Sequence, residues 1–497
     1  MRKVKQTIAV VALTAMIGGG TLLPIQPANA ATAVPYATVS QAASAYFNQQ
    51  VDKAIQQLVD KKVLVGYQDG SIRAEQNITN AEFLKMAILT LHVEQANNAS
   101  TQPAKWYTPF IETAVNASLI EKADDIVPNE LADKTATAQL VAKALQRDVK
   151  SVLYWMDGLG IDGSTLNRGQ AAQLLVLAEK SVRSADAQIV SIRSINKVSL
   201  EVTFSAPLAL ADEATDAANA NFAFSDELKL VNQPRLKTGS IATYIVPVQT
   251  MTPGKTYTTN YKGKQQHSVV ASNEKLQLSD VRQVTADTFE VESFRADGVI
   301  DYGYMISAYS GGRGANAAIL DENNKLNGKQ MQVIPSLASR QATLTPAGGD
   351  PITVNYVGYT QSTDGKQEPK FRLPAGTTLQ AGVEYTVSAD WFDLEDNTFT
   401  AQTIAPLTIA AVDKVNETTL NVTLSVDPGD ELFAYRSIQL KGSDGTTLTA
   451  QYKVQTRSGA TGVFELQQEG KLVDGVSYEV APVGSWAVVD KVTLAAK

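Results

Sequence analysis

The feature that most constrains the fold of this chain is a change in the spacing of its apolar residues. In the first part, apolar residues recur at intervals of three and four, as at Ile55 and Leu58, which is the spacing of one face of a helix. Later they alternate with polar residues, as at Leu200 and Val202, which is typical of half-buried strands. The sequence therefore predicts a helical part and then a β-region, separated by the polar stretch 181–187.

The N-terminus has the layout of a secretory signal. Three cations, Arg2, Lys3 and Lys5, precede an apolar run over 8–17, and small residues follow at 28–30. This pattern predicts a signal peptide over 1–30 that is removed on export. The run is shorter than the roughly 20 residues that span a bilayer, and no later stretch approaches that length. We expect an exported protein with no transmembrane segment after cleavage.

Composition excludes several classes of function. The chain of 497 residues has no cysteine and two histidines, so disulfide scaffolds, thiolate zinc sites and thiol nucleophiles are excluded. Its net charge is −8, and removal of the three signal-peptide cations makes it more negative still. Such a charge argues against a nucleic-acid partner. Carboxylates are plentiful, but nothing marks an acid and nucleophile pair, so the chain is predicted not to be an enzyme.

The β-region repeats itself. Segments that begin near residues 190, 278 and 409 read alike, and a Gly-x-x-Tyr motif follows each of them, at Gly254/Tyr257, Gly382/Tyr385 and Gly475/Tyr478. Glycine suits a tight turn, and the tyrosine is expected to hydrogen-bond nearby backbone, as in the tyrosine corner of β-sandwiches. The spacing predicts three tandem immunoglobulin-like sandwiches over 185–272, 273–408 and 409–497, the middle one with an insertion.

One stretch of the helical part carries a dense motif, formed in order by Gly66, Tyr67, Asp69, Gly70, Arg73, Ile78, Thr79, Ala81, Glu82 and Phe83. It resembles the surface-layer homology (SLH) motif of Gram-positive cell-wall proteins, and two poorer copies follow over 106–140 and 154–170. The resemblance implies an all-α pseudo-trimer over 31–182, with repeats at about 42–95, 103–146 and 150–182. In this family such a module binds a pyruvylated secondary cell-wall polymer.

The resemblance also implies which residues meet the polymer. The polymer-binding set is Arg168, Arg73, Asn80, Tyr67, Gly66, Trp106 and Trp155. At the key motif position the three repeats read 79–82, 136–139 and 167–170, so that Arg168 alone keeps the family's cation. Thr79 with Glu82, and Asn167 with Gln170, are expected to cap helices. Arg73 has an alternative role in pairing with Asp69 or Glu75.

Together these features predict a secreted surface-layer (S-layer) structural protein, anchored non-covalently to wall polysaccharide and self-associating into a lattice through its β-domains. The alternative is an anchored adhesin that uses the insertion, with Tyr302, Tyr304, Tyr309 and Arg313. Calcium is left open as an assembly ion, because acidic clusters occur at 124–125, 393–396 and 427–431 and hard oxygen ligands suit it. None of these clusters has EF-hand spacing.

Overall fold

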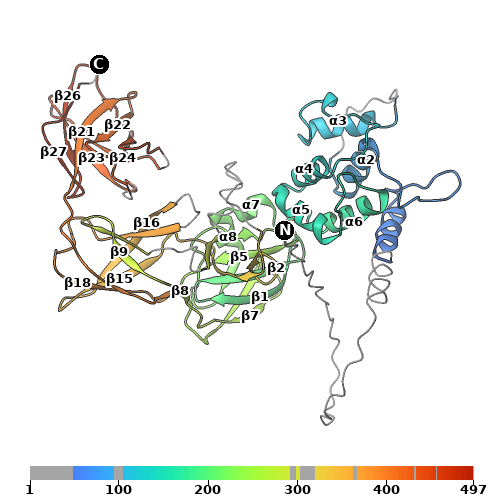
Figure 1. Ribbon diagram of the computed structural model, residues 1–497, viewed down its shortest axis with the longest axis horizontal. Helices are drawn as coiled ribbons and strands as arrows, with labels where there is room; N and C mark the ends of the chain where they lie inside the picture. Colours follow the sequence, from blue (N-terminus) through green and yellow to red (C-terminus); the bar gives the residue numbers. More distant parts are fainter. Residues whose placement is uncertain are drawn as a thin grey trace, which may run out of the picture.

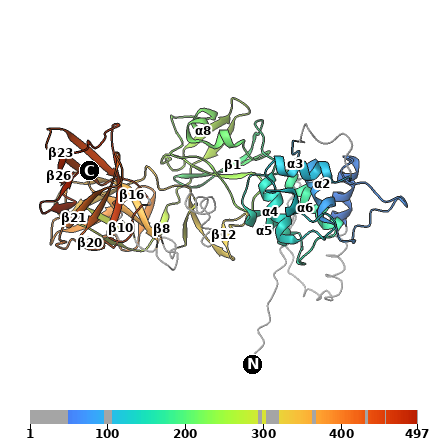
Figure 2. The ribbon, with the colours of Figure 1, turned by 90° about the horizontal axis from the view of Figure 1, so that it is seen from above.

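The computed structural model describes residues 49–94, 105–291, 298–302, 319–361, 367–429, 433–454 and 456–495. The chain runs from a helical part through a first β-unit to a middle and a C-terminal β-unit, which follow one another in Figure 1 from blue to red. Figure 2 shows the same succession from above. The predicted order of a helical part followed by a large β-region is confirmed. The predicted signal peptide lies outside the described residues.

The helical part consists of short helices around one core. Residues 49–60 are helical, and they are followed by α2 (Asn80–Thr90), α3 (Thr108–Asn116), the 3₁₀ turn η1 (Ala123–Asp125), α4 (Lys134–Ala144), α5 (Val149–Gly158) and α6 (Arg168–Glu179). Their shared core includes Leu84, Val141 and Leu174, each fully buried. Because none of these helices exceeds a few turns within the described residues, packing against this core, more than intrinsic propensity, stabilises them.

Three of these helices start from a closed ring of backbone hydrogen bonds. The Ile78 N–H donates to the Leu166 carbonyl (3.0 Å), Leu166 donates to Ala132 (3.1 Å), and Ala132 donates to Ile78 (2.9 Å). Each of the three residues immediately precedes the N-cap of α2, α4 or α6. The ring therefore makes the three helix starts equivalent to one another.

This equivalence corrects the expected alignment of the second repeat. The N-cap of α4 is Asp133, whose carboxylate accepts from the Ala136 N–H at 2.9 Å, so the motif position spans 133–136 and not 136–139. The cation position of the second repeat is thus Lys134, and the expectation that Arg168 alone keeps a cation is wrong. The sequence pattern favoured 136–139 because Gln139 resembles a residue that could complete a capping box. Ala136, the last residue of 133–136, cannot do so.

The first β-unit pairs two sheets. Its strands are β1 (Ile189–Asn196), β2 (Ser199–Phe204), β3 (Phe222–Phe224), β4 (Arg235–Leu236), β5 (Thr243–Pro247), β6 (Thr256–Tyr261) and β7 (His267–Val270), with short helices α7 (Leu210–Glu213) and α8 (Thr215–Asn221). One sheet has the order β1-β2-β5-β4 and the other β3-β6-β7. Aromatic rings of both sheets, including Phe204 and Tyr261, meet in the core between them.

The middle β-unit is built on a sheet of order β20-β18-β15-β16-β17-β10-β9, with β8 and β19 paired beside it. Its strands are β8 (Leu276–Leu278), β9 (Val281–Gln283), β10 (Thr288–Val291), β11 (Val299–Asp301), β12 (Lys325–Leu326), β13 (Lys329–Gln330), β14 (Gln332–Ile334), β15 (Gln341–Pro346), β16 (Ile352–Gln361), β17 (Gln367–Arg372), β18 (Glu384–Ser388), β19 (Phe392–Leu394) and β20 (Thr398–Thr400). Strands β11 to β14 fall around the predicted insertion.

The C-terminal β-unit is a sheet of order β27-β21-β22-β25-β24-β23-β26-β28. Its strands are β21 (Leu407–Lys414), β22 (Thr419–Leu424), β23 (Ser437–Gly442), β24 (Thr447–Tyr452), β25 (Thr461–Leu466), β26 (Ser477–Pro482), β27 (Ala487–Val489) and β28 (Thr493–Ala495). Phe433, Phe464 and Tyr478 are buried in its core.

The expected role of the three Gly-x-x-Tyr motifs is confirmed. In each, the backbone N–H five residues before the tyrosine donates to its hydroxyl oxygen, at 3.0 Å for Tyr257, 2.9 Å for Tyr385 and 3.0 Å for Tyr478. The preceding glycines have φ of 73°, 80° and 84°, a conformation that favours glycine. The first and C-terminal β-units also share a register shift at the start of their first hairpin, in β1–β2 and β21–β22.

Candidate functional site

The motif stretch 66–73 forms a tight loop between the first helix and α2. The Tyr67 N–H donates to the Ser71 carbonyl at 2.9 Å, and the Gly70 N–H donates to the Tyr67 carbonyl at 2.9 Å. A Cβ on Gly66 would lie 3.2 Å from the Ser71 carbonyl oxygen, so the loop closes tightly at this glycine. These bonds present the ring of Tyr67, which is half-buried, at the surface of the helical part.

Arg73 lies over this ring. Its guanidinium carbon is 3.9 Å from the centre of the Tyr67 ring, close enough for a cation–π contact. Nη2 pairs with Asp69 at 3.0 Å, and Nε donates to the Ser71 hydroxyl at 3.2 Å. Hydrogen bonds from the Ser71 side chain and backbone, and then from Arg73, lower the pKa of Asp69. The pairing with Asp69 expected as one alternative is therefore made, yet 47% of the Arg73 side chain stays exposed.

Arg168 lies beneath the same ring but is buried. Its guanidinium carbon is 5.1 Å from the ring centre and only 5% of the residue is exposed. Nη1 pairs with Glu82 at 2.8 Å and Nε donates to the Ile72 carbonyl at 3.0 Å. Arg168 thus connects the start of α6 to the loop 66–73 and packs against the Tyr67 ring.

Both expected capping boxes are present, and one of them also serves this site. Glu82 accepts from the Thr79 N–H through Oε2 at 3.0 Å and from Arg168 through Oε1 at 2.8 Å. Asn167 and Gln170 cap α6 reciprocally. The carboxylate that starts α2 therefore also fixes the arginine at the start of α6.

The equivalent position of the first repeat opens into a groove. Asn80, which corresponds to Arg168, borders a cavity of about 300 Å³ together with the loop 119–126 and helix α4. Its side-chain amide donates to the Val127 carbonyl at 3.0 Å. On the opposite side, Lys143 donates to the Leu119 carbonyl at 3.1 Å. This position therefore borders a groove, but its residue is an asparagine and not a cation.

The third equivalent position is held by Lys134, which sequence reasoning missed. Its ammonium pairs with Asp157 of α5 at 2.8 Å, and 19% of its side chain is exposed. The signal that could have found it is the Asp133 N-cap, since aspartate is a strong N-cap residue even without a glutamate three positions later.

The two tryptophans of the predicted set have different environments. Trp106 is 53% exposed at the start of α3, with the Lys85 ammonium 6.0 Å from its ring. Trp155 is 5% exposed, and its indole N–H donates to the Gly239 carbonyl of the first β-unit at 2.6 Å. Trp155 therefore contributes to the contact between the helical part and the β-region, which removes it from the expected polymer-binding set.

The insertion tyrosine that the structure describes is also buried. Tyr302 has no exposed surface, accepts a hydrogen bond from the Thr238 N–H and packs in a small core with Ile245 and Val333. It thus joins the insertion to the first β-unit, and the expectation that it forms a recognition surface is wrong. Tyr304, Tyr309 and Arg313 lie outside the described residues.

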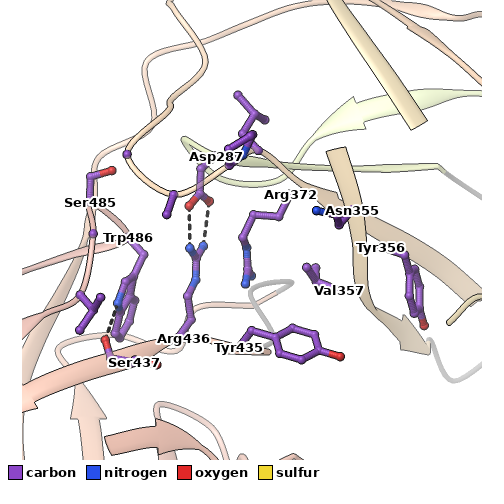
Figure 3. Close-up of a pocket in the computed structure, with 16 residues that line it drawn as sticks. Asp287, Asn355, Tyr356, Val357, Arg372, Tyr435, Arg436, Ser437, Ser485 and Trp486 are labelled. Atoms are coloured by element: carbon purple, nitrogen blue, oxygen red, sulfur yellow. Dashed lines mark hydrogen bonds and ion pairs between the residues drawn. The ribbon is translucent and has the colours of Figure 1, made fainter. Parts of the chain in front are cut away.

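A second hollow lies at the junction of the middle and C-terminal β-units. This cavity of about 450 Å³ is lined by residues from both units, among them Asp287, Arg372, Tyr435, Arg436 and Trp486 (Figure 3). No local sequence signal predicted it, because its walls come from segments far apart in the chain.

The part of the chain that the structure describes also bears on metals and membranes. Across its ranges, no three histidine, aspartate or glutamate side chains come together as a metal site requires. Nor does any helix within the same ranges have the length and apolarity to cross a bilayer.

Comparison with known proteins identifies the family of the motif stretch. The family model of the S-layer homology domain matches residues 49–84. The expected SLH resemblance is therefore confirmed for this segment, and the domain assigns the chain to the cell surface, as a secreted protein associated with the cell wall. No curated protein matches the chain.

Solved structures resemble the chain weakly. The S-layer protein rSbsC(31-844) is 14% identical, with 93% of this chain and 81% of that chain covered and a TM-score of 0.15. The I9–I11 tandem of titin is 11% identical (62% and 99% covered, TM-score 0.17). A Bacteroides ovatus glucan-utilisation protein, SGBP-B, solved with a mixed-linkage heptasaccharide, is 12% identical (63% and 71% covered, TM-score 0.17). Such TM-scores do not establish a common arrangement of whole chains.

Proposed function

We propose that this protein is an S-layer structural protein, anchored to carboxylate-bearing secondary wall polysaccharide through a three-repeat SLH module, with three immunoglobulin-like β-units that build the lattice. The observation that carries the proposal is the Arg73 guanidinium held on the Tyr67 ring within the matched segment. The closed ring of Ile78, Ala132 and Leu166 supports the three-repeat arrangement.

The chemistry of the Tyr67 surface suits an acidic sugar. A pyruvate ketal presents a planar carboxylate, which a guanidinium can meet with two parallel hydrogen bonds. Arg73 Nη1 has no protein partner within the described residues, and the side chain is already oriented by Asp69 and Ser71. Because the cation is ordered before the polymer arrives, binding costs less side-chain entropy. The adjacent Tyr67 ring offers an apolar surface to the face of a sugar.

The three equivalent positions are proposed to contribute unequally. The position with Tyr67, Arg73 and Arg168 is the principal one. The Asn80 groove has space but lacks the arginine, and the Lys134 ammonium is engaged by Asp157. A single strong position and two weak ones would anchor each molecule reversibly, and assembly into a lattice would add avidity. The proposed function involves no catalysis.

A sedimentation assay with cell-wall sacculi tests the anchor. The purified protein should pellet with intact sacculi and stay in solution when the wall polymer has been stripped. Arg73→Ala should reduce pelleting at least tenfold in apparent affinity. Arg193→Ala is the matched control, because Arg193 is similarly exposed and also paired with a carboxylate, but lies on β1. Pelleting that survives stripping, or is equal in both variants, would refute the proposed anchor.

A further inference from the structure

The cavity between the middle and C-terminal β-units is lined by residues of both units. The middle unit contributes the turn before β10, part of β16 and the segment 372–376. The C-terminal unit contributes residues 435–437 and 483–486. Its volume of about 450 Å³ lies within the ~300–1,000 Å³ that small-molecule sites occupy.

Polar contacts across the junction hold these walls in place. Arg436 donates twice to the Asp287 carboxylate, at 2.6 and 2.8 Å, and Arg372 donates to the Ala434 carbonyl and to the Thr288 hydroxyl. Figure 3 shows the Arg372 side chain extending alongside Arg436. The charged lining therefore consists of one carboxylate and two guanidiniums, a net positive charge in a protein whose overall charge is −8.

One lining residue, Tyr435, is unusual in both its exposure and its backbone conformation. It is 66% exposed, and its φ of 60° lies in the left-handed region, which costs a non-glycine residue about 1–2 kcal/mol. A large aromatic residue that is both exposed and strained contributes little to folding. Figure 3 shows its ring among the residues that line the cavity, and the Tyr356 ring, farther along the lining, packs edge-on against Phe371 of the middle core. Such a residue at the edge of a preformed cavity indicates a ligand.

We propose that this junction cavity binds a saccharide. Sugar rings have apolar C–H faces and hydroxyl edges, which match the exposed, amphipathic ring of Tyr435. Asn355 and Ser485, both in the lining, offer the amide and hydroxyl groups that such edges bond. Because the two units share the cavity, the bound sugar bridges them. This site is separate from the SLH module and does not depend on the proposed anchoring.

The test uses isothermal titration of the full chain in an Arg73→Ala background, which weakens the principal position of the proposed anchor. The probes are oligosaccharides released by partial acid hydrolysis from purified wall polysaccharide and, in a second arm, a set of unrelated hexose oligomers. The two arms distinguish a sugar of the cell wall from an unrelated sugar, and binding of either one supports the proposal. We expect one site per chain whose affinity depends on Tyr435.

Two substitutions at Tyr435 keep the test independent of folding. Tyr435→Gly removes the ring and relieves the strained φ, so it should weaken binding at least tenfold without lowering thermal stability. Tyr435→Phe keeps the ring and should stay within about threefold. The proposal is overturned if neither probe set binds, or if Tyr435→Gly binds as the parent does. It is also overturned if Tyr435→Gly changes only self-association, which would assign the surface to a second copy of the chain.

Discussion

Asp287 and Arg436 lie 149 residues apart in the chain and form a doubly hydrogen-bonded ion pair across the junction of the middle and C-terminal β-units. Burial alone would raise the pKa of Asp287, but the hydrogen bonds and charge of Arg436, with the charge of Arg372, lower it to about 2. The pair is largely buried, with 6% of the Arg436 side chain and 14% of the Asp287 side chain exposed. The stability of the junction therefore depends on pH.

The first prediction concerns acid stability. Because the folded-state pKa of Asp287 is about 2, below the ordinary value of 3.8, its stabilisation is present above pH 4 and is lost as the pH falls towards 2. The shift corresponds to about 2.5 kcal/mol. We expect Asp287→Asn to destabilise the junction at pH 7 and to remove this part of the acid dependence. Calorimetry of both proteins between pH 7 and pH 2 measures it, and parallel pH profiles would contradict the assignment.

The second prediction separates the two arginines around Tyr67. Arg168→Ala leaves Glu82 and the Ile72 carbonyl without their buried partner, so it should cost the helical part about 3 kcal/mol. Arg73 is exposed, and Arg73→Ala should change stability by less than about 0.5 kcal/mol. Both variants should lose sacculus binding. Denaturant unfolding beside the pelleting assay gives the comparison, and equal stability of the two variants would contradict the burial argument.

The third prediction is a gain of binding. Asn80 occupies the position that corresponds to Arg168, beside a groove of about 300 Å³. Asn80→Arg should strengthen sacculus binding about three- to tenfold, roughly 0.7–1.4 kcal/mol, because it places a guanidinium at the edge of the groove, where Asn80 carries no charge. Asn80→Gln is the control, since it lengthens the side chain without adding charge. An Asn80→Arg variant that binds no better than this control would show that the groove takes no polymer.

The fourth prediction tests the contact between the helical part and the first β-unit. Trp155→Phe removes the donor to the Gly239 carbonyl and should cost about 1–3 kcal/mol. Gly239→Ala should be as disruptive, because φ is +76° and the added Cβ would lie 2.9 Å from the Tyr154 ring. In calorimetry both should make the helical part unfold before the β-region. Trp106→Phe, at an exposed tryptophan, controls for loss of an indole and should leave the transition unchanged.

Local patterns in the sequence were sufficient to predict the capped starts of α2 and α6 and the Gly-x-x-Tyr turns, because each depends on residues three to five positions apart. They also led to Tyr67 and Arg73. They did not reveal that Arg168 is buried, since its partner Glu82 is 86 residues away. The junction cavity could not be predicted from local patterns either. A sandwich motif indicates the fold of one β-unit and carries no information about how two units pack together.

The ring formed by Ile78, Ala132 and Leu166 has a further consequence for the size of the proposed anchor. In a solenoid each repeat contacts only its neighbours, so repeats can be added or lost at the ends. A closed ring has no end, and deletion of any one repeat would leave a backbone donor and an acceptor unpaired in the centre of the other two. We therefore expect the helical part to act as one unit: the stretch 49–84 that carries the family signature needs the segments around Ala132 and Leu166 to complete its hydrogen bonds.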